Sequence, residues 1–204
     1  MIISEQSMQG MRVIVTAAGT GIGRTIADAF VAQGARVHIC DVVADRLAAV
    51  ETAVPAITTT LTDVSQPEQV DTLFAEAISH LGGLDVLVNN AGIAGPTTPV
   101  EDVTPAEWEQ TLAMELGEFG IRVNAICPGA VDGPRMDRVI AAEAAAQNVP
   151  SEQVRQGYLQ QVSLRTFINR RDIANLILFL CSPAGAKISG QALSVDGHTE
   201  TLRM

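Results

Sequence analysis

Apolar residues follow two alternating patterns along this chain. Short continuous apolar runs, typical of buried strands, alternate with segments in which apolar residues recur every three or four positions, as on amphipathic helices. The expected strands span residues 11–16, 36–41, 56–61, 84–89, 121–126 and 192–195. The expected helices span residues 44–53, 67–81, 105–118, 135–147, 151–161 and 172–181, with a further helix that begins in the glycine cluster 19–23 and ends before Gly34.

Strand and helix alternate strictly, and the strands are apolar throughout. This pattern is typical of a parallel sheet that helices cover on both faces. The sequence therefore predicts an α/β fold with a doubly wound, Rossmann-like parallel sheet of six strands. With 204 residues and no linker or internal repeat, we expect a single domain over residues 1–204.

Composition narrows the class of partner. The chain is 47% hydrophobic and 3% aromatic, with a formal net charge of −10. The acidic balance argues against nucleic acid or an anionic membrane surface as partner, and the few aromatic rings argue against single strands. No apolar run is long enough to span a membrane.

The cysteines and the first ten residues indicate the cellular compartment of the protein. Cys40, Cys127 and Cys181 lie in apolar stretches without metal-ligand spacing, so we expect free thiols in a reducing compartment and no metal site. Residues 1–10 lack the basic start, apolar segment and cleavage site of a signal peptide. These features predict a cytoplasmic protein.

A glycine cluster joins the first strand to the helix after it. Gly19, Gly21 and Gly23 let the backbone turn sharply and approach a pyrophosphate. The helix N-terminus, at Thr20 and Ile22, would supply unpaired N–H groups and a partial positive charge. A plain strand–helix turn is the alternative, but the strand before and the amphipathic helix after favour dinucleotide binding.

The end of the second strand carries an acidic residue. Asp41 lies 18 residues after Gly23, where a carboxylate can accept both ribose hydroxyls of an adenosine and repel a 2′-phosphate. Neither Thr20 nor Val42 is basic, so the sequence favours NAD over NADP. The alternative is a solvated residue at a strand end.

These motifs resemble the short-chain dehydrogenase/reductase family in its single-domain, NAD-dependent form. Residues 16–23 resemble the family's TGxxxGIG motif, with Ala17 replacing the first glycine. Residues 89–92 match its NNAG signature, and 121–124 with 128–129 match its IRVN…PG segment. The resemblance covers residues 11–197 and further includes Asp63-Val64, Gly190-Gln191 and Val195–Gly197, with Gly133 and His198 departing from a usual threonine and glycine.

The resemblance also implies which residues contact the cofactor. Asp63-Val64 would touch the adenine, and Pro128-Gly129 would lie near the nicotinamide. The expected cofactor-binding residues are Gly19, Thr20, Gly21, Ile22, Gly23, Asp41, Asp63, Val64, Asn90, Ala91, Gly92, Pro128, Gly129 and Val131.

The residues that the family uses for proton transfer are absent from the sequence. The resemblance implies a tyrosine with a lysine one helical turn later and a serine on the preceding strand. A phenol needs such a nearby cation to exchange its proton at neutral pH. This chain has one tyrosine, Tyr158, and one lysine, Lys187, which are 29 residues apart. We therefore assign no catalytic residue.

The absent block can be located near residues 110–115. Residues 104–110 resemble the start of the family's fifth helix and 112–116 the end of its sixth, so about 40–60 residues with one central strand are absent between them. A continuous helix over 105–118 would then connect neighbouring strands of one closed-up sheet of six strands, not seven. Residues 134–162 resemble the lid over the substrate. A true deletion, deliberate editing and unrecorded residues all fit this gap.

Three functional interpretations follow. The first is an NAD(P)-dependent oxidoreductase that transfers hydride between a secondary alcohol and a ketone, which needs the absent block. The second is a catalytically inactive module that holds NAD or pairs with an intact relative, and the third is a damaged fragment. The resemblance also implies a homo-oligomer and a small-molecule substrate whose identity the sequence does not give.

Overall fold

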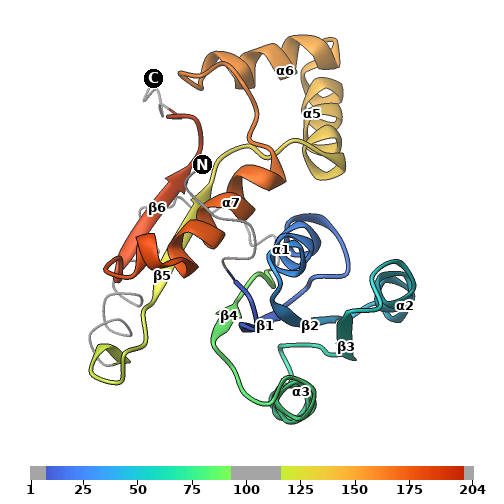
Figure 1. Cartoon of the computed structure of the whole chain (residues 1–204). Helices are drawn as coiled ribbons and strands as arrows, with labels where there is room; N and C mark the ends of the chain where they lie inside the picture. Colours follow the sequence, from blue (N-terminus) through green and yellow to red (C-terminus); the bar gives the residue numbers. More distant parts are fainter. Residues whose placement is uncertain (1–7, 93–115, 200–204) are drawn as a thin grey trace. The chain divides into compact units, whose positions relative to one another are not determined.

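The structure, a computed structural model, describes residues 8–92 and 116–199. Backbone contacts divide the chain into two compact units. The first unit comprises residues 1–98 and 174–187, and the second comprises residues 99–173 and 188–204. Figure 1 shows the helices and strands of each unit.

The first unit contains a parallel sheet of four strands in the order β3-β2-β1-β4. Its strands are β1 (Arg12–Val15), β2 (Arg36–Asp41), β3 (Ile57–Leu61) and β4 (Val86–Val88). Helices α1 (Gly21–Ala32), α2 (Ala44–Ala53) and α3 (Pro67–Leu81) connect them. Because β1 pairs with both β2 and β4, it lies inside this sheet.

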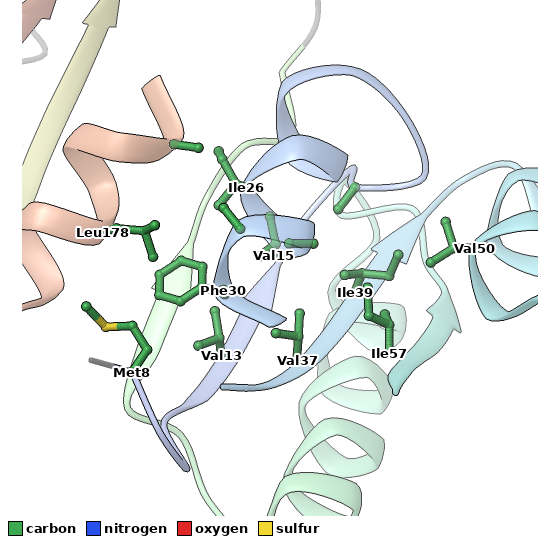
Figure 2. Packing of buried hydrophobic residues seen from close by; sticks show 14 of the residues in the cluster. Met8, Val13, Val15, Ile26, Phe30, Val37, Ile39, Val50, Ile57 and Leu178 are labelled. Carbon is green, nitrogen blue, oxygen red and sulfur yellow. The ribbon is translucent and has the colours of Figure 1, made fainter. Parts of the chain in front are cut away.

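Helices cover both faces of this sheet. On one face, Val13 and Val15 pack with Phe30 of α1 and Leu178 of α7 (Arg170–Cys181), as Figure 2 shows. On the other face, Ile14 packs with Ala77 and Leu81 of α3. Consecutive residues of β1 therefore point to opposite apolar layers, which explains the continuous apolar run in the sequence. The predicted doubly wound arrangement is confirmed.

An ion pair fixes the start of β1 beside the start of β4. Arg12 donates from Nε to Asp85 Oδ2 at 2.8 Å and from Nη2 to Asp85 Oδ1 at 2.6 Å. The backbone N–H of Arg12 also reaches Oδ2, at 2.9 Å. These hydrogen bonds from Arg12 hold the pKa of Asp85 at about 2. The fork geometry favours one register of the two strands.

The second unit contains a parallel pair of strands and a helical hairpin. Strands β5 (Asn124–Pro128) and β6 (Gln191–Val195) pair in register from Asn124 and Gln191. Helices α5 (Pro134–Gln147) and α6 (Ser151–Gln160) enclose a small core of Met136, Ile140, Ala144 and Val154. The turn between them uses Asn148 in the left-handed conformation, at φ 53°. The two helices predicted within 134–162 are confirmed.

Six strands are described, as predicted, but they form two sheets and not one. In the described residues β4 pairs with β1 alone and β5 with β6 alone, so the expectation of a single closed sheet was wrong. The cause is physical, because apolar periodicity gives a strand its faces but not its partners. The helix predicted over 105–118 lies outside the described residues up to position 115. None of the described helices could span a membrane.

The fifth predicted strand begins three residues late. The helical turn at Leu116 and Gly117 ends in a bend, where Ile121 N–H donates to Leu116 O at 3.2 Å and Gly120 has φ 73°. Residues 121–123 follow this turn without regular secondary structure, and β5 starts at Asn124. Because Ile121 and Val123 are apolar, the sequence pattern assigned them to the strand and did not indicate the turn.

A buried histidine links β2, β3 and α3 through polar contacts. His38 is fully buried, with Nδ1 2.7 Å from Thr58 Oγ1 and Nε2 3.0 Å from Thr60 Oγ1. Thr60 donates in turn to Glu76, and the His80 ring stacks on His38 with centroids 5.9 Å apart. Burial, and then the neighbouring His80, lower the pKa of His38 to about 4 against a weaker opposing effect of Glu76.

This shift predicts acid sensitivity that depends on His38. Because its folded pKa of about 4 lies below the unfolded 6.5, the unfolded chain alone binds the proton between these values. Stability is therefore fully present above pH 6.5 and decreases by about 3 kcal/mol as the pH falls to 4. Urea unfolding of wild type and His38→Gln at pH 7 and pH 4 measures this. Equal losses in both proteins would contradict it.

Candidate functional site

The carboxyl ends of β1, β2 and β4 lie at the same edge of the first unit's sheet because the strands are parallel. The loop of residues 16–20 connects β1 to α1 at this edge. Ligands of open α/β sheets bind beyond the carboxyl ends of the strands. The first unit therefore presents its sequence-predicted nucleotide residues where a dinucleotide is expected.

Asp41 and the glycine-rich loop are directly bonded. The Gly19 N–H donates to Asp41 Oδ2 at 3.0 Å, and the Val43 N–H donates to Oδ1 at 3.1 Å. A Cβ on Gly19 would lie 2.8 Å from the same Oδ2, so only glycine allows this approach. The Asp41 side chain is 5% exposed. The carboxylate is thus held at the strand end and is not merely solvated.

Gly21 and Gly23, the other two glycines of the cluster, are required for different structural reasons. Gly21, the first residue of α1, has φ 69°, a conformation that side chains disfavour. A Cβ on Gly23 would lie 2.5 Å from Asn90 Nδ2 and 2.8 Å from Ala17 O, so Gly23 allows close packing. Thr20 is the exposed N-cap of α1, and Ile22 packs on the main core.

Asn90 ties the end of β4 to the glycine-rich loop. Its Nδ2 donates to Thr16 O at 2.9 Å and to Ala17 O at 3.1 Å. Thr16 Oγ1 accepts in return from the backbone N–H groups of Asn90, at 3.0 Å, and Ala91, at 2.9 Å. Asn90 therefore braces the loop through its side chain. Thr16 opens the glycine-rich motif but was not among the predicted cofactor-binding residues, and its hydroxyl completes this brace.

The remaining first-unit residues lie at strand ends. Asp63 follows β3 and accepts from the Ser65 N–H at 2.9 Å, a bond that lowers the pKa of Asp63. Val64 beside it is 42% exposed. Gly92 is exposed with open space around its Cα. Val64 and Gly92 thus leave room for a ligand.

Three predicted cofactor residues belong to the second unit. Pro128 ends β5, and the Gly129 N–H donates to Val195 O at 3.0 Å. A Cβ on Gly129 would lie 2.8 Å from the Cα of Asp196, so the ends of β5 and β6 pass in contact only because this residue is glycine. Val131 forms a parallel bridge with Ile168.

Neither Tyr158 nor Lys187 has the surroundings of a proton-transfer pair. The Tyr158 hydroxyl donates to Glu143 Oε2 at 2.9 Å, across the α5–α6 hairpin. Burial, and then Glu143, raise the pKa of Tyr158. Lys187 is exposed in the loop before β6. An acidic neighbour suppresses the phenolate that a nearby lysine would favour.

Arg46 is a second residue that the sequence interpretation missed. It lies in the first turn of α2, and its Nη1 is 3.6 Å from Asp41 Oδ1. The sequence interpretation considered only Thr20, just before Gly21, and Val42, just after Asp41, as positions for a basic residue. The turn after β2 returns the chain toward Asp41, so a residue five positions later becomes its neighbour.

Comparisons with known proteins agree with these motifs. A family profile described as short chain dehydrogenase matches residues 11–114, and one described as enoyl-(acyl carrier protein) reductase matches residues 109–198. A 7α-hydroxysteroid dehydrogenase of Escherichia coli (strain K12) is 30% identical, with 93% of this chain and 94% of that protein covered. A sorbitol dehydrogenase of Cereibacter sphaeroides is 26% identical, with 93% and 97% covered.

Solved structures share the fold. A 7α-hydroxysteroid dehydrogenase complexed with NADH and 7-oxo glycochenodeoxycholic acid gives a TM-score of 0.80 at 28% identity, with 96% of each chain covered. An L-sorbose reductase of Gluconobacter frateurii, complexed with NADPH and L-sorbose, gives 0.84 at 22% identity, with 98% of this chain and 100% of that chain covered. These two neighbours differ in the nicotinamide cofactor that each holds.

The alignment with the Escherichia coli dehydrogenase is consistent with an absent block. It spans 250 positions, whereas 93% of 204 residues is about 190. About 60 positions of the alignment therefore have no counterpart in this chain. The two family profiles meet at residues 109–114, which is consistent with the junction expected near 110–115.

Ala17 is strained in the loop, which gives a prediction for stability. Its φ of 49° lies in the left-handed region, where a Cβ costs roughly 1–2 kcal/mol. Ala17→Gly should stabilise the folded chain by about 0.5–1 kcal/mol after the extra freedom of glycine in the unfolded chain is subtracted. Urea unfolding measures this, and Ala18→Gly, at a buried neighbour without positive φ, should destabilise. If Ala17→Gly were less stable than the wild type, the proposal that Ala17 is strained would be refuted.

Proposed function

Because this chain belongs to the short-chain dehydrogenase/reductase family, we propose that it binds NAD through the carboxyl edge of the first unit's sheet. The family consists of NAD(P)-dependent oxidoreductases of alcohols and ketones. The observation that carries the proposal is the buried carboxylate of Asp41, bonded to the Gly19 N–H at the end of β2.

Several residues of the first unit would each contact a different part of the dinucleotide. Asp41 would accept a ribose hydroxyl, and the open surface at Val64 would receive the adenine. Gly19, Gly21 and Gly23 would let the pyrophosphate approach the N-terminus of α1, whose N–H groups and dipole favour an anion. The bound nicotinamide would supply the hydride acceptor or donor.

NAD is the proposed cofactor because a 2′-phosphate would bring negative charge beside Asp41. A carboxylate and a phosphate within a few ångströms repel each other, and the cost grows where water is excluded. The relatives do not decide this preference, since their structures hold NADH in one case and NADPH in another. The preference therefore rests on Asp41 itself.

Hydride transfer between a secondary alcohol and a ketone would need the absent block. The one phenol of the chain, Tyr158, donates a hydrogen bond to Glu143, and burial together with Glu143 raises its pKa. For the 204-residue polypeptide we therefore propose an inactive NAD-binding module, and for a chain with the block restored, an alcohol/ketone oxidoreductase. Residues 134–162 would cover the substrate. Free thiols support a cytoplasmic location, and family membership supports a homo-oligomer.

The binding proposal predicts that adenosine-side contacts dominate affinity. NAD and ADP-ribose should bind with equal affinity within about threefold, because most nicotinamide-side contacts would belong to the absent block. Asp41→Asn should weaken both ligands by about tenfold or more, because a hydrogen bond to a charged group is lost. Isothermal titration measures these affinities.

Asp45→Asn provides the matched control for this titration. It removes the same charge from an exposed residue of the first turn of α2. It should leave both affinities unchanged within about twofold. A large advantage of NAD over ADP-ribose, or equal effects of the two substitutions, would refute the proposed binding mode.

The inactive state predicts the results of two further measurements. Intact mass spectrometry should give 21.5 kDa, and the same sample should form no NADH from NAD with a panel of secondary alcohols. A mass larger by about 60 residues would show that the block is present. Turnover at 21.5 kDa would instead show that another group moves the proton.

A further inference from the structure

Ser163 and His198 form a hydrogen-bonded pair in the second unit, just after β6. Ser163 Oγ lies 2.6 Å from His198 Nδ1, and both residues are exposed. When the imidazole proton is on Nε2, Nδ1 accepts a hydrogen bond from the Ser163 hydroxyl. A nucleophile and a base within hydrogen-bond reach are the first requirement of covalent catalysis. The simplest alternative is a structural contact between two loops.

The backbone of the turn after β6 holds His198 in position for this contact. His198 has φ 60°, in the left-handed region, at the position that departs from a usual glycine. Its N–H donates to Asp196 Oδ1 at 2.9 Å, and its carbonyl accepts from the Ser163 N–H, also at 2.9 Å. The Leu164 N–H donates to Gly197 O at 3.2 Å. The two loops are therefore joined by backbone bonds on either side of the Ser163–His198 contact.

The surroundings of the pair determine which substrates it can use. Among the described residues no carboxylate bonds to His198 Nε2, so the pair lacks the third member of a triad. The N–H groups of Ser163, Leu164 and Arg165 all donate to backbone carbonyls, so these three cannot stabilise an oxyanion. The pair therefore suits esters whose leaving group departs easily. Leu164, which is 71% exposed beside Ser163, favours an apolar acyl group.

We propose that Ser163 is a nucleophile, with His198 as its general base, and that it takes the acyl group of activated aryl esters of apolar acids. Ser163 Oγ bonds to the acyl carbon while its proton passes to His198 Nδ1. The bond from the acyl carbon to the leaving oxygen then breaks, and the phenol departs with that proton. The product is an alkyl ester, which hydrolyses more slowly than the aryl ester, so the acylated serine accumulates. This activity goes beyond nucleotide binding and needs neither Asp41 nor the absent block.

The test incubates the 204-residue chain with p-nitrophenyl butyrate and follows the acylation of each serine by peptide mass spectrometry. Ser151, the exposed first residue of α6, is the control within the same molecule. Ser163 should be acylated at least about tenfold faster than Ser151, which is less than the roughly 100–10,000-fold of a general base in an enzyme because oxyanion donors are lacking. Equal rates at the two serines, or butyrylation of His198 without any at Ser163, would overturn the proposal.

Two substitutions of His198 distinguish a base from a structural contact. His198→Gly removes the imidazole and suits the left-handed backbone, and His198→Asn keeps a polar side chain that tolerates this backbone but is not a base. Both should slow the acylation of Ser163 by about tenfold or more and leave that of Ser151 unchanged within about twofold. Circular dichroism and urea unfolding identify the folded variants. Acylation of Ser163 at the wild-type rate in either folded variant would show that His198 is not the base.

Discussion

The side-chain amide of Asn90 determines the shape of the glycine-rich loop at the proposed nucleotide-binding edge. Through Nδ2 it holds the carbonyls of Thr16 and Ala17, and the Thr16 hydroxyl bonds back to the end of β4. The loop fixed in this way directs the Gly19 N–H at Asp41, 3.0 Å away. The ends of β4 and β2 are therefore coupled through one loop. The left-handed Ala17 is tolerated because Asn90 holds its carbonyl in place.

Local patterns predicted the elements and the glycine-rich turn because these depend on neighbours in sequence. The apolar run of β1 and the helical spacing of α3 both formed as expected. Contacts made by folding were not visible in the sequence. Arg46 approaches Asp41 only because the chain turns back after β2, and Thr60 joins His38 to Glu76 only because α3 packs against β3. Such pairs depend on register and packing, which spacing does not give.

Because spacing does not give strand pairing, the sequence also did not predict that the strands form two sheets. Strands β4 and β5 are apolar, as strands covered on both faces are. In the described structure, however, Leu87 of β4 is 40% exposed and Cys127 of β5 is exposed. Phe119, just before β5, is 71% exposed. The composition of these strands therefore suits a sheet with more cover than the described residues supply. About 60 positions of the alignment with the Escherichia coli dehydrogenase have no counterpart in this chain, and the two family profiles meet between β4 and β5, at residues 109–114.

The proposed nucleotide binding and the proton transfer that the family performs would depend on different parts of the sequence. The brace, the glycine-rich loop and Asp41 all lie before residue 92, upstream of the junction, and their core includes Phe30. Helix α7 completes that core from beyond the junction, because Leu178 packs on the same face as Phe30 (Figure 2). The adenosine side of the site therefore keeps its support without the block. Loss of the block would remove proton transfer and leave the geometry at Asp41 intact, so that binding without turnover is the physical consequence.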